Sequence, residues 1–272
     1  MKKTFLFIMA AASVLAVSCS SDDSNDTPPI DNTVYLPLSQ GNYWVYDVTS
    51  TQEAGQATGR DSLYVANDTV VGSTTYKKLK TQSMANGFFS GALSGNAIRQ
   101  NGTKLQLTGS TAFAFSEYFP VELSITDFTF FDSAASAGTQ LGTTSGTIEQ
   151  PTEEGYNLSI EYELKATTGE TLNSHTVQGG DTYSNVKTVN ITLTLTITAL
   201  FDAGGFTIPF EVLPEQDVVT STQYYVENIG AVHVSTLIEY NLVDLSGLNV
   251  NLPIPQSGTI QQEEVLDTYN VE

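Results

Sequence analysis

Apolar and polar residues alternate one by one along several stretches of the chain, and this period of two most restricts the possible fold. In residues 156–165 every even-numbered position is apolar or aromatic, and residues 189–198 and 232–240 show the same alternation. Successive side chains of a β-strand point to opposite faces, so each stretch predicts a strand with one buried and one wetted face. The stretch around residues 189–198 is long: about 14 residues at ~3.3 Å each would span on the order of 45 Å.

Weaker alternation marks residues 43–48, 218–227 and 259–267, and turn signals separate the expected strands. These signals are Asn101-Gly102, Gly169, Gly179-Gly180, residues 202–205, residues 228–230 and Ser246-Gly247. After residue 18 we find no convincing run with a period of 3.6, and residues 129–137 could hold one short helical turn. The pattern therefore predicts an all-β fold with few or no helices, a curved antiparallel meander, with a β-sandwich as the alternative.

The composition excludes several classes of protein. The 272 residues include 30 acidic and 10 basic side chains, for a formal charge of −20, whereas nucleic-acid binding needs a basic surface. The single cysteine excludes a disulfide framework and a cysteine-based zinc site. Hydrophobic residues make up 40% of the chain, which is enough for a packed core.

The first 18 residues have the features of a secretory signal peptide. Lys2 and Lys3 precede an apolar run over residues 5–17, which is too short for a comfortable transmembrane helix. The run ends in Leu15-Ala16-Val17-Ser18-Cys19, which resembles a bacterial lipobox except that Leu15 lies four places before the cysteine rather than three. We therefore expect Cys19 to be lipidated and to anchor the protein in a membrane. The alternative is an ordinary signal peptide that contains a cysteine.

Residues 19–33 follow as a polar tether, and residues 34–272 form the expected β domain. The tether begins with Ser, Asp, Asn and Thr and contains Pro28-Pro29, a composition that favours disorder. Loss of Lys2 and Lys3 with the signal peptide leaves 8 basic residues and a charge of −22. Residues 133–146, rich in Ala, Gly, Ser and Thr, are where the domain could subdivide.

Three short segments resemble secreted and surface lipoproteins of bacteroidetes. Residues 35–46 look like a "PL…GN.W.Y" opening segment, residues 177–186 like a "V.aGtF.nv" hairpin, and residues 224–232 like a "YyakGiGlV" segment. The resemblance implies a half-barrel sheet like that of LolA-like envelope lipoproteins, whose concave face can hold lipid. This chain differs from LolA in lacking clear helices to plug the concavity, and it carries its own anchor.

The same family resemblance suggests a role for the acidic run after Cys19. It is similar to the export signal of bacteroidete surface lipoproteins, which implies an outer-membrane anchor facing the cell exterior. The alternatives are a solvated spacer and a protein on the periplasmic face. Three Asp-Ser/Thr-apolar triplets also resemble the O-glycosylation site of these bacteria, which makes Ser62, Thr69 and Ser133 candidate modification sites.

Residues that carry out catalysis are scarce. His175 is expected in a turn and His233 on the polar face of a strand, each as an ordinary surface histidine. The sequence has no nucleophile elbow, zinc-binding His-Glu-x-x-His helix or phosphate loop. The loop at residues 202–205 is the remaining candidate for calcium, without the EF-hand pattern. We therefore expect neither an enzyme nor a bound metal or cofactor.

Three classes of function are left. The first is a non-catalytic, membrane-anchored lipoprotein that holds an apolar ligand on its curved sheet, with lining from phenylalanines between residues 88 and 131 that could equally be core. The second is a surface protein that binds glycans through Tyr224 and Tyr225, with Trp44 as an aromatic platform for a sugar or lipid or, alternatively, as a core anchor. The third is a hydrolase, for which a His–carboxylate pair or two carboxyl groups in one cleft would be the structural sign. The oligomeric state is open.

Overall fold

The computed structural model describes residues 33–114, 120–152, 155–202, 204–244 and 255–272, with only the backbone of residues 111–114 and 120–122. Within these ranges it contains twelve strands and one helix. In chain order they are β1 (Tyr43–Gln52), β2 (Gly55–Val71), β3 (Thr74–Thr81), α1 (Phe88–Gly95), β4 (Ala97–Asn101), β5 (Lys104–Ala114), β6 (Pro120–Asp132), β7 (Gln140–Pro151), β8 (Asn157–Thr176), β9 (Thr182–Asp202), β10 (Thr207–Val226), β11 (Gly230–Asn241) and β12 (Ser257–Asn270).

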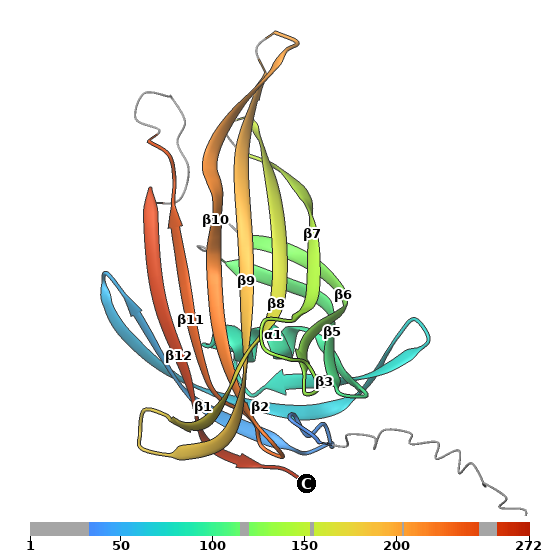
Figure 1. Cartoon of the computed structure of the whole chain (residues 1–272). Helices are drawn as coiled ribbons and strands as arrows, with labels where there is room; N and C mark the ends of the chain where they lie inside the picture. Colours follow the sequence, from blue (N-terminus) through green and yellow to red (C-terminus); the bar gives the residue numbers. More distant parts are fainter. Residues whose placement is uncertain (1–32, 115–119, 153–154, 203, 245–254) are drawn as a thin grey trace, which may run out of the picture. The chain divides into compact units, whose positions relative to one another are not determined.

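All strands belong to one antiparallel sheet, which confirms the predicted all-β meander. The order is β6-β5-β4-β3-β2-β1-β12-β11-β10-β9-β8-β7, so the first and last strands of the chain are hydrogen-bonded neighbours. The two edge strands, β6 and β7, are consecutive in the chain and are joined by residues 133–139. A Cβ on Gly142 of β7 would lie 2.6 Å from the carbonyl oxygen of Thr129 in β6, so the edges approach each other there. The sheet is thus a nearly closed barrel with one seam (Figure 1).

The alternating pattern builds the longest strands. In β9 the residues Val189, Ile191, Leu193, Leu195, Ile197 and Ala199 are buried while most of the residues between them are partly exposed. The strand has 21 residues, which is longer than the stretch expected from its pattern. The predicted turn at Gly169 is wrong, because this residue lies inside β8. The β8–β9 register shifts between Thr168 and Thr171, so the break in the pattern is a bulge within a continuous strand.

Helix α1 was not predicted, and the predicted helical turn at residues 129–137 is wrong. Residues 129–132 belong to β6. Helix α1 has eight residues and its N-cap, Gly87, makes no side-chain capping bond. It lies on the concave side of the sheet (Figure 1), where Phe89, Ser90 and Leu93 are buried. The sheet therefore does have a helix in its concavity, contrary to the expectation from the sequence.

Candidate functional site

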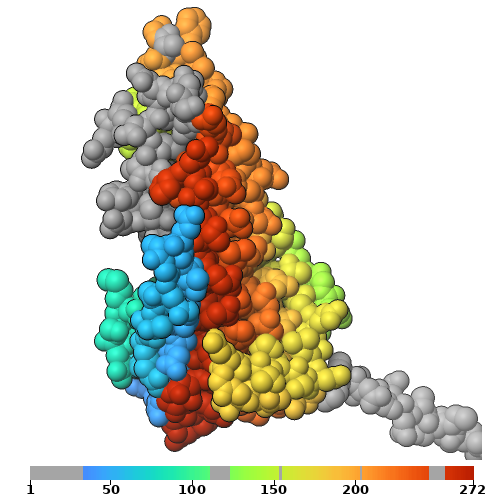
Figure 2. Space-filling view, turned by 90° about the vertical axis from the view of Figure 1, so that its left-hand side faces the viewer, coloured from blue at the N-terminus to red at the C-terminus, as the bar shows by residue number. Residues whose placement is uncertain are grey.

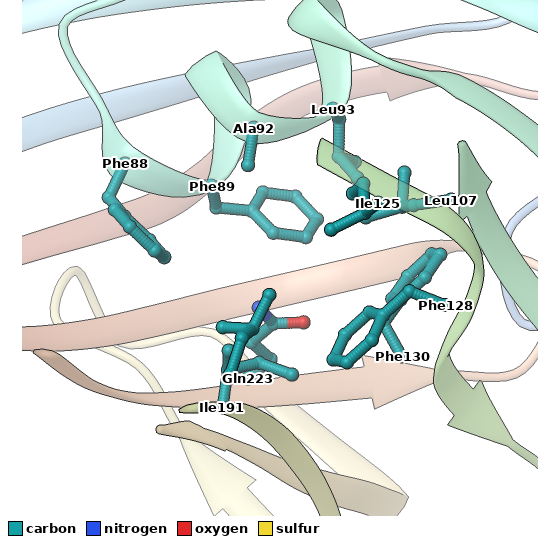
Figure 3. A pocket seen from close by; sticks show the side chains of 11 residues that line it. Phe88, Phe89, Ala92, Leu93, Leu107, Ile125, Phe128, Phe130, Ile191 and Gln223 are labelled. Carbon is teal, nitrogen blue, oxygen red and sulfur yellow. The ribbon is translucent and has the colours of Figure 1, made fainter. Parts of the chain in front are cut away.

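A small apolar cavity lies between α1 and the inner face of the sheet (Figure 3). Its volume is ≈ 40 Å³. Ten of its lining residues are apolar and come from the helix and from strands on both halves of the sheet: Phe88, Phe89, Ala92, Leu93, Leu107, Ile125, Phe128, Phe130, Leu164 and Ile191. The phenylalanines expected from the sequence thus both line the cavity and belong to the core. Phe113, Phe115 and Phe119 lie outside the described side chains.

The eleventh lining residue, Gln223, brings an amide to this apolar space (Figure 3). Its Oε1 accepts a hydrogen bond of 2.6 Å from the hydroxyl of Tyr225, which is fully buried. Tyr225 in turn packs against Phe131 and Phe89, with ring centroids 4.6 and 6.4 Å apart. With its oxygen engaged, the Gln223 amide still has the two donors of its NH₂ group.

The helix that covers the cavity is held by acceptors from distant strands. Glu264 of β12 is buried and accepts from the backbone N–H of Phe89 at 2.6 Å and of Ser90 at 3.1 Å, and from the Ser90 hydroxyl at 2.8 Å. These donors are the free N–H groups of the first helical turn. Burial raises the pKa of Glu264 to about 7, although the three hydrogen bonds oppose the shift.

Two further side chains complete this attachment. Asp61 of β2, which is buried, accepts from the backbone N–H groups of Asn86 and Gly87 at 2.8–3.0 Å. Gln262 of β12 accepts from the N–H of Phe88 at 2.6 Å. A Cβ on Gly87 would lie 2.1 Å from the Glu264 carboxyl group, so only glycine permits this close approach. The N-terminus of helix α1 is therefore capped by the sheet and not by its own sequence.

The two histidines of the chain meet on the outer face of the sheet. His175 Nε2 lies 3.0 Å from His233 Nδ1, and His233 Nε2 lies 2.7 Å from Glu263 Oε2. The His175 ring stacks on Tyr224 with centroids 4.1 Å apart and planes 9° apart. Strand β8 is separated from β10 and β11 by one and two intervening strands, and neighbouring strands are ≈ 4.8 Å apart. His175 of β8 can therefore contact Tyr224 of β10 and His233 of β11 only if the β8–β9 hairpin folds over that face. Figures 1 and 2 show this hairpin, in yellow, crossing the sheet toward β12.

The hydrogen bonds assign the protons of this cluster. Glu263 is an acceptor, so His233 carries its proton on Nε2 and presents the Nδ1 lone pair to the N–H of His175. Burial and the neighbouring His233 lower the pKa of His175. Burial raises the pKa of Glu263, but hydrogen bonds from His233, Ser235 and Gln261 outweigh it, and the net shift is downward. The lowered pKa of His175 favours its neutral imidazole, and the lowered pKa of Glu263 favours its carboxylate.

This His–carboxylate pair differs from the base of a hydrolase. In a catalytic triad the histidine nitrogen opposite the carboxylate faces the hydroxyl of the nucleophile. Here that nitrogen faces a second imidazole. The nearby Ser235 hydroxyl donates 2.9 Å to Glu263 and not to an imidazole. The arrangement is suited to holding the hairpin in place. The sequence did not predict these contacts, because His175 and His233 are 58 residues apart.

The residues predicted to bind ligand do not form one site. Trp44 and Tyr225 have no exposed surface, and the Trp44 indole N–H donates 2.5 Å to the carbonyl of Ile229. Trp44 thus has the core position that the sequence offered as the alternative to an aromatic platform. Tyr224 lies on the outer face within the histidine cluster, so the neighbouring tyrosines point to opposite faces of β10.

The predicted modification sites differ in accessibility. Ser62 and Thr69 are half-buried in β2, and Ser133 is buried at the start of the β6–β7 connection.

Cys19, the tether and the Ser246-Gly247 turn lie outside the described residues. Across the ranges that are described, no three His, Cys, Asp or Glu side chains group to hold a metal ion, and no helix has the length and apolarity to span a membrane.

Comparisons of the chain with protein-family models, with curated proteins and with solved structures found no match.

Proposed function

We propose that this chain is a lipid-anchored envelope protein that acts by binding and not by catalysis, and that its interior cavity takes the apolar part of a ligand. The observation that carries the proposal is the cavity inside the curved sheet, lined by ten apolar side chains and one amide. Binding sites of this kind combine apolar walls with a few polar groups that fix the ligand's orientation.

The size of the cavity limits what enters without rearrangement. A volume of ≈ 40 Å³ holds only a few atoms, so it fits the end of an apolar chain rather than a whole lipid. A longer segment requires α1 to shift away from the sheet. The eight-residue helix has no side-chain cap of its own at its N-terminus. Its first turn depends on Glu264 and Gln262, and Asp61 holds the N–H of its N-cap, Gly87. Helix α1 would then be the element that moves when the ligand binds.

The anchor places this site at a membrane. The lipobox-like sequence before Cys19 supports lipidation, and each buried CH₂ of an acyl chain adds ~0.8 kcal/mol to membrane affinity. The acidic tether supports export to the outer surface of the outer membrane, with the periplasmic face as the alternative.

A fluorescent fatty acid tests the cavity. Dansyl-undecanoic acid is titrated into the full chain carrying Cys19→Ala, which avoids detergent, and we expect saturable enhancement of its emission. Ala92→Phe fills the cavity from α1 and should weaken binding at least tenfold, whereas the same change at the exposed Ala54 of the β1–β2 turn should not. Equal binding by Ala92→Phe and Ala54→Phe would overturn the proposal.

Photo-cross-linking tests the same site without Ala92→Phe, in case that variant does not fold. A diazirine-labelled fatty acid is cross-linked to the same protein and the labelled peptides are identified by mass spectrometry. Labels on lining residues of α1, β5, β6, β8, β9 or β10 support the interior site. Labels confined to other strands refute it.

A further inference from the structure

A second depression lies on the outer face of the sheet, remote from the interior cavity. It is lined by Gly41, Tyr43, Val45, Ser62, Tyr64 and Gln82, which come from the start of β1, from β2 and from the segment after β3, and its volume is ≈ 410 Å³. We call it the Tyr43–Tyr64 groove. It shares no residue with the cavity under α1. Its volume falls within the range of small-molecule sites.

Two tyrosines form one wall of the groove because of the strand register. Tyr43 of β1 and Tyr64 of β2 are direct partners in the antiparallel ladder, so their side chains leave the same face a few ångströms apart. Tyr43 is 39% exposed and Tyr64 is half-buried. The next pair on this face, Val45 and Ser62, gives an apolar floor and a hydroxyl group.

The backbone around the groove is fixed. The N–H of Gln82 donates 3.3 Å to the carbonyl of Ser62, which places the Gln82 amide at the groove. On the opposite side the N–H of Gly41 donates 3.1 Å to the carbonyl of Val65. Gly41 has φ +95°, and a Cβ there would meet nothing within 4 Å. The groove is therefore preformed by the sheet and its adjoining turn.

Charge distinguishes the classes of ligand that this groove could take. None of its six lining residues is charged. On the same face, exposed Lys80 of β3 is the direct ladder partner of Tyr64. Along the β1–β2 ladder the next charged pair is Asp47 opposite Arg60, and Arg60 also binds Asp267. A chain with a net charge of −20 repels acidic polymers. The uncharged lining and the acidic chain favour a neutral ligand over an acidic one.

We propose that the Tyr43–Tyr64 groove binds a neutral saccharide. The C–H face of a sugar ring is apolar and suits the face of a tyrosine ring, whose π-system is electron-rich. The sugar hydroxyls pair with donors and acceptors of the kind that Ser62, Gln82 and the two phenol groups carry. A lipid would leave these polar groups unsatisfied in an open groove. The inference goes beyond the apolar cavity and gives surface glycan binding a location different from Trp44 and Tyr225.

The test measures binding of neutral and acidic oligosaccharides to the full chain carrying Cys19→Ala. Linear β-glucan, mannan and arabinan fragments are compared with alginate fragments by isothermal titration calorimetry, with Ser62 shown to be unmodified by intact mass. We expect at least one neutral series to bind and the alginate fragments not to bind. Tyr43→Ala and Tyr64→Ala should each weaken binding about tenfold, the upper range for an aromatic contact. Tyr269→Ala, at a tyrosine 41% exposed outside the groove, should leave it unchanged.

Each other result rejects the proposal. If the folded protein binds none of the neutral fragments, the proposed saccharide ligand is wrong. If it binds alginate more tightly than the neutral fragments, the argument from charge is wrong. Binding that survives both Tyr43→Ala and Tyr64→Ala refutes the location. Ala92→Phe separates this site from the interior cavity, since it should abolish fatty-acid binding and leave saccharide binding intact.

Discussion

At the scale of single residues, Glu264 is the side chain whose environment departs most from that of a surface carboxylate. It is fully buried, and burial raises its pKa from 4.5 to about 7. The folded protein therefore binds a proton at pH values where the unfolded chain has released it. The contribution of Glu264 to stability is complete below the unfolded pKa and is lost as the pH rises through about 7.

We predict that Glu264→Gln makes the free energy of unfolding less dependent on pH between 5 and 8. A shift from 4.5 to about 7 corresponds to about 3 kcal/mol, so the wild type should lose up to about that much relative to the variant across this range. Urea denaturation at pH 5, 6, 7 and 8 measures it. Glu239→Gln removes an exposed carboxylate from β11 and controls for net charge. A constant difference between wild type and Glu264→Gln at all four pH values would contradict the prediction.

At the scale of elements, the sequence predicts those whose conformation depends on their own pattern. Strands β8 and β9 alternate over residues 157–166 and 189–199, and the turn at Gly179-Gly180 uses glycines that have φ of +114° and +104°. Helix α1 has no such local signal, because the acceptors at its start are distant in the sequence. Glu264 accepts from the N–H of Phe89, 175 residues away, and Asp61 accepts from the N–H of Asn86, 25 residues away and just before the helix. The position of the β8–β9 hairpin depends likewise on contacts with β10 and β11. Long-range contacts of this kind leave no period in the sequence.

The β8–β9 hairpin should loosen at acidic pH. The pKa of His175 is lowered, so the neutral form of the cluster contributes stability above the ordinary histidine pKa, and this contribution is lost as the pH falls. One proton can be shared between His175 and His233, but a second places two N–H groups against each other across 3.0 Å. Glu263 contacts Nε2 of His233, the ring nitrogen that does not face His175.

Hydrogen exchange measures this loosening. Between pH 7.5 and 5, amides of residues 171–183 should lose protection after correction for the intrinsic exchange rate. His175→Phe keeps a ring to stack on Tyr224 but cannot be protonated, so its hairpin should stay protected at pH 5. Equal loss of protection in wild type and His175→Phe would show that another group controls the hairpin.

At the scale of the whole molecule, the pairing of β1 with β12 unites two six-stranded meanders into one sheet. The stretch at residues 133–146, where the sequence changes in composition, contains the connection between the two edges of that sheet. Alternation predicts the strands and their buried faces but not which ends of the chain pair. That pairing brings Glu264 and Gln262 of the last strand beneath α1, near the other end of the chain. The candidate site therefore depends on topology more than on any local motif.

We predict that lipidation of Cys19 attaches this molecule to a membrane and that its loss releases the whole protein. Two or three acyl chains hold a protein on a membrane almost permanently, whereas the mature chain alone, with a charge of −22, has no attraction to an anionic surface. In fractionated cells, we expect the wild type to sediment with membranes and to resist a high-salt wash. Cys19→Ala should move to the soluble fraction, and Ser20→Ala, the matched change at the next residue, should behave as wild type. If Cys19→Ala stays in the washed membranes, another part of the chain provides the attachment. For the anchored wild type, digestion by protease added to intact cells indicates the outer surface, and protection indicates the periplasmic face.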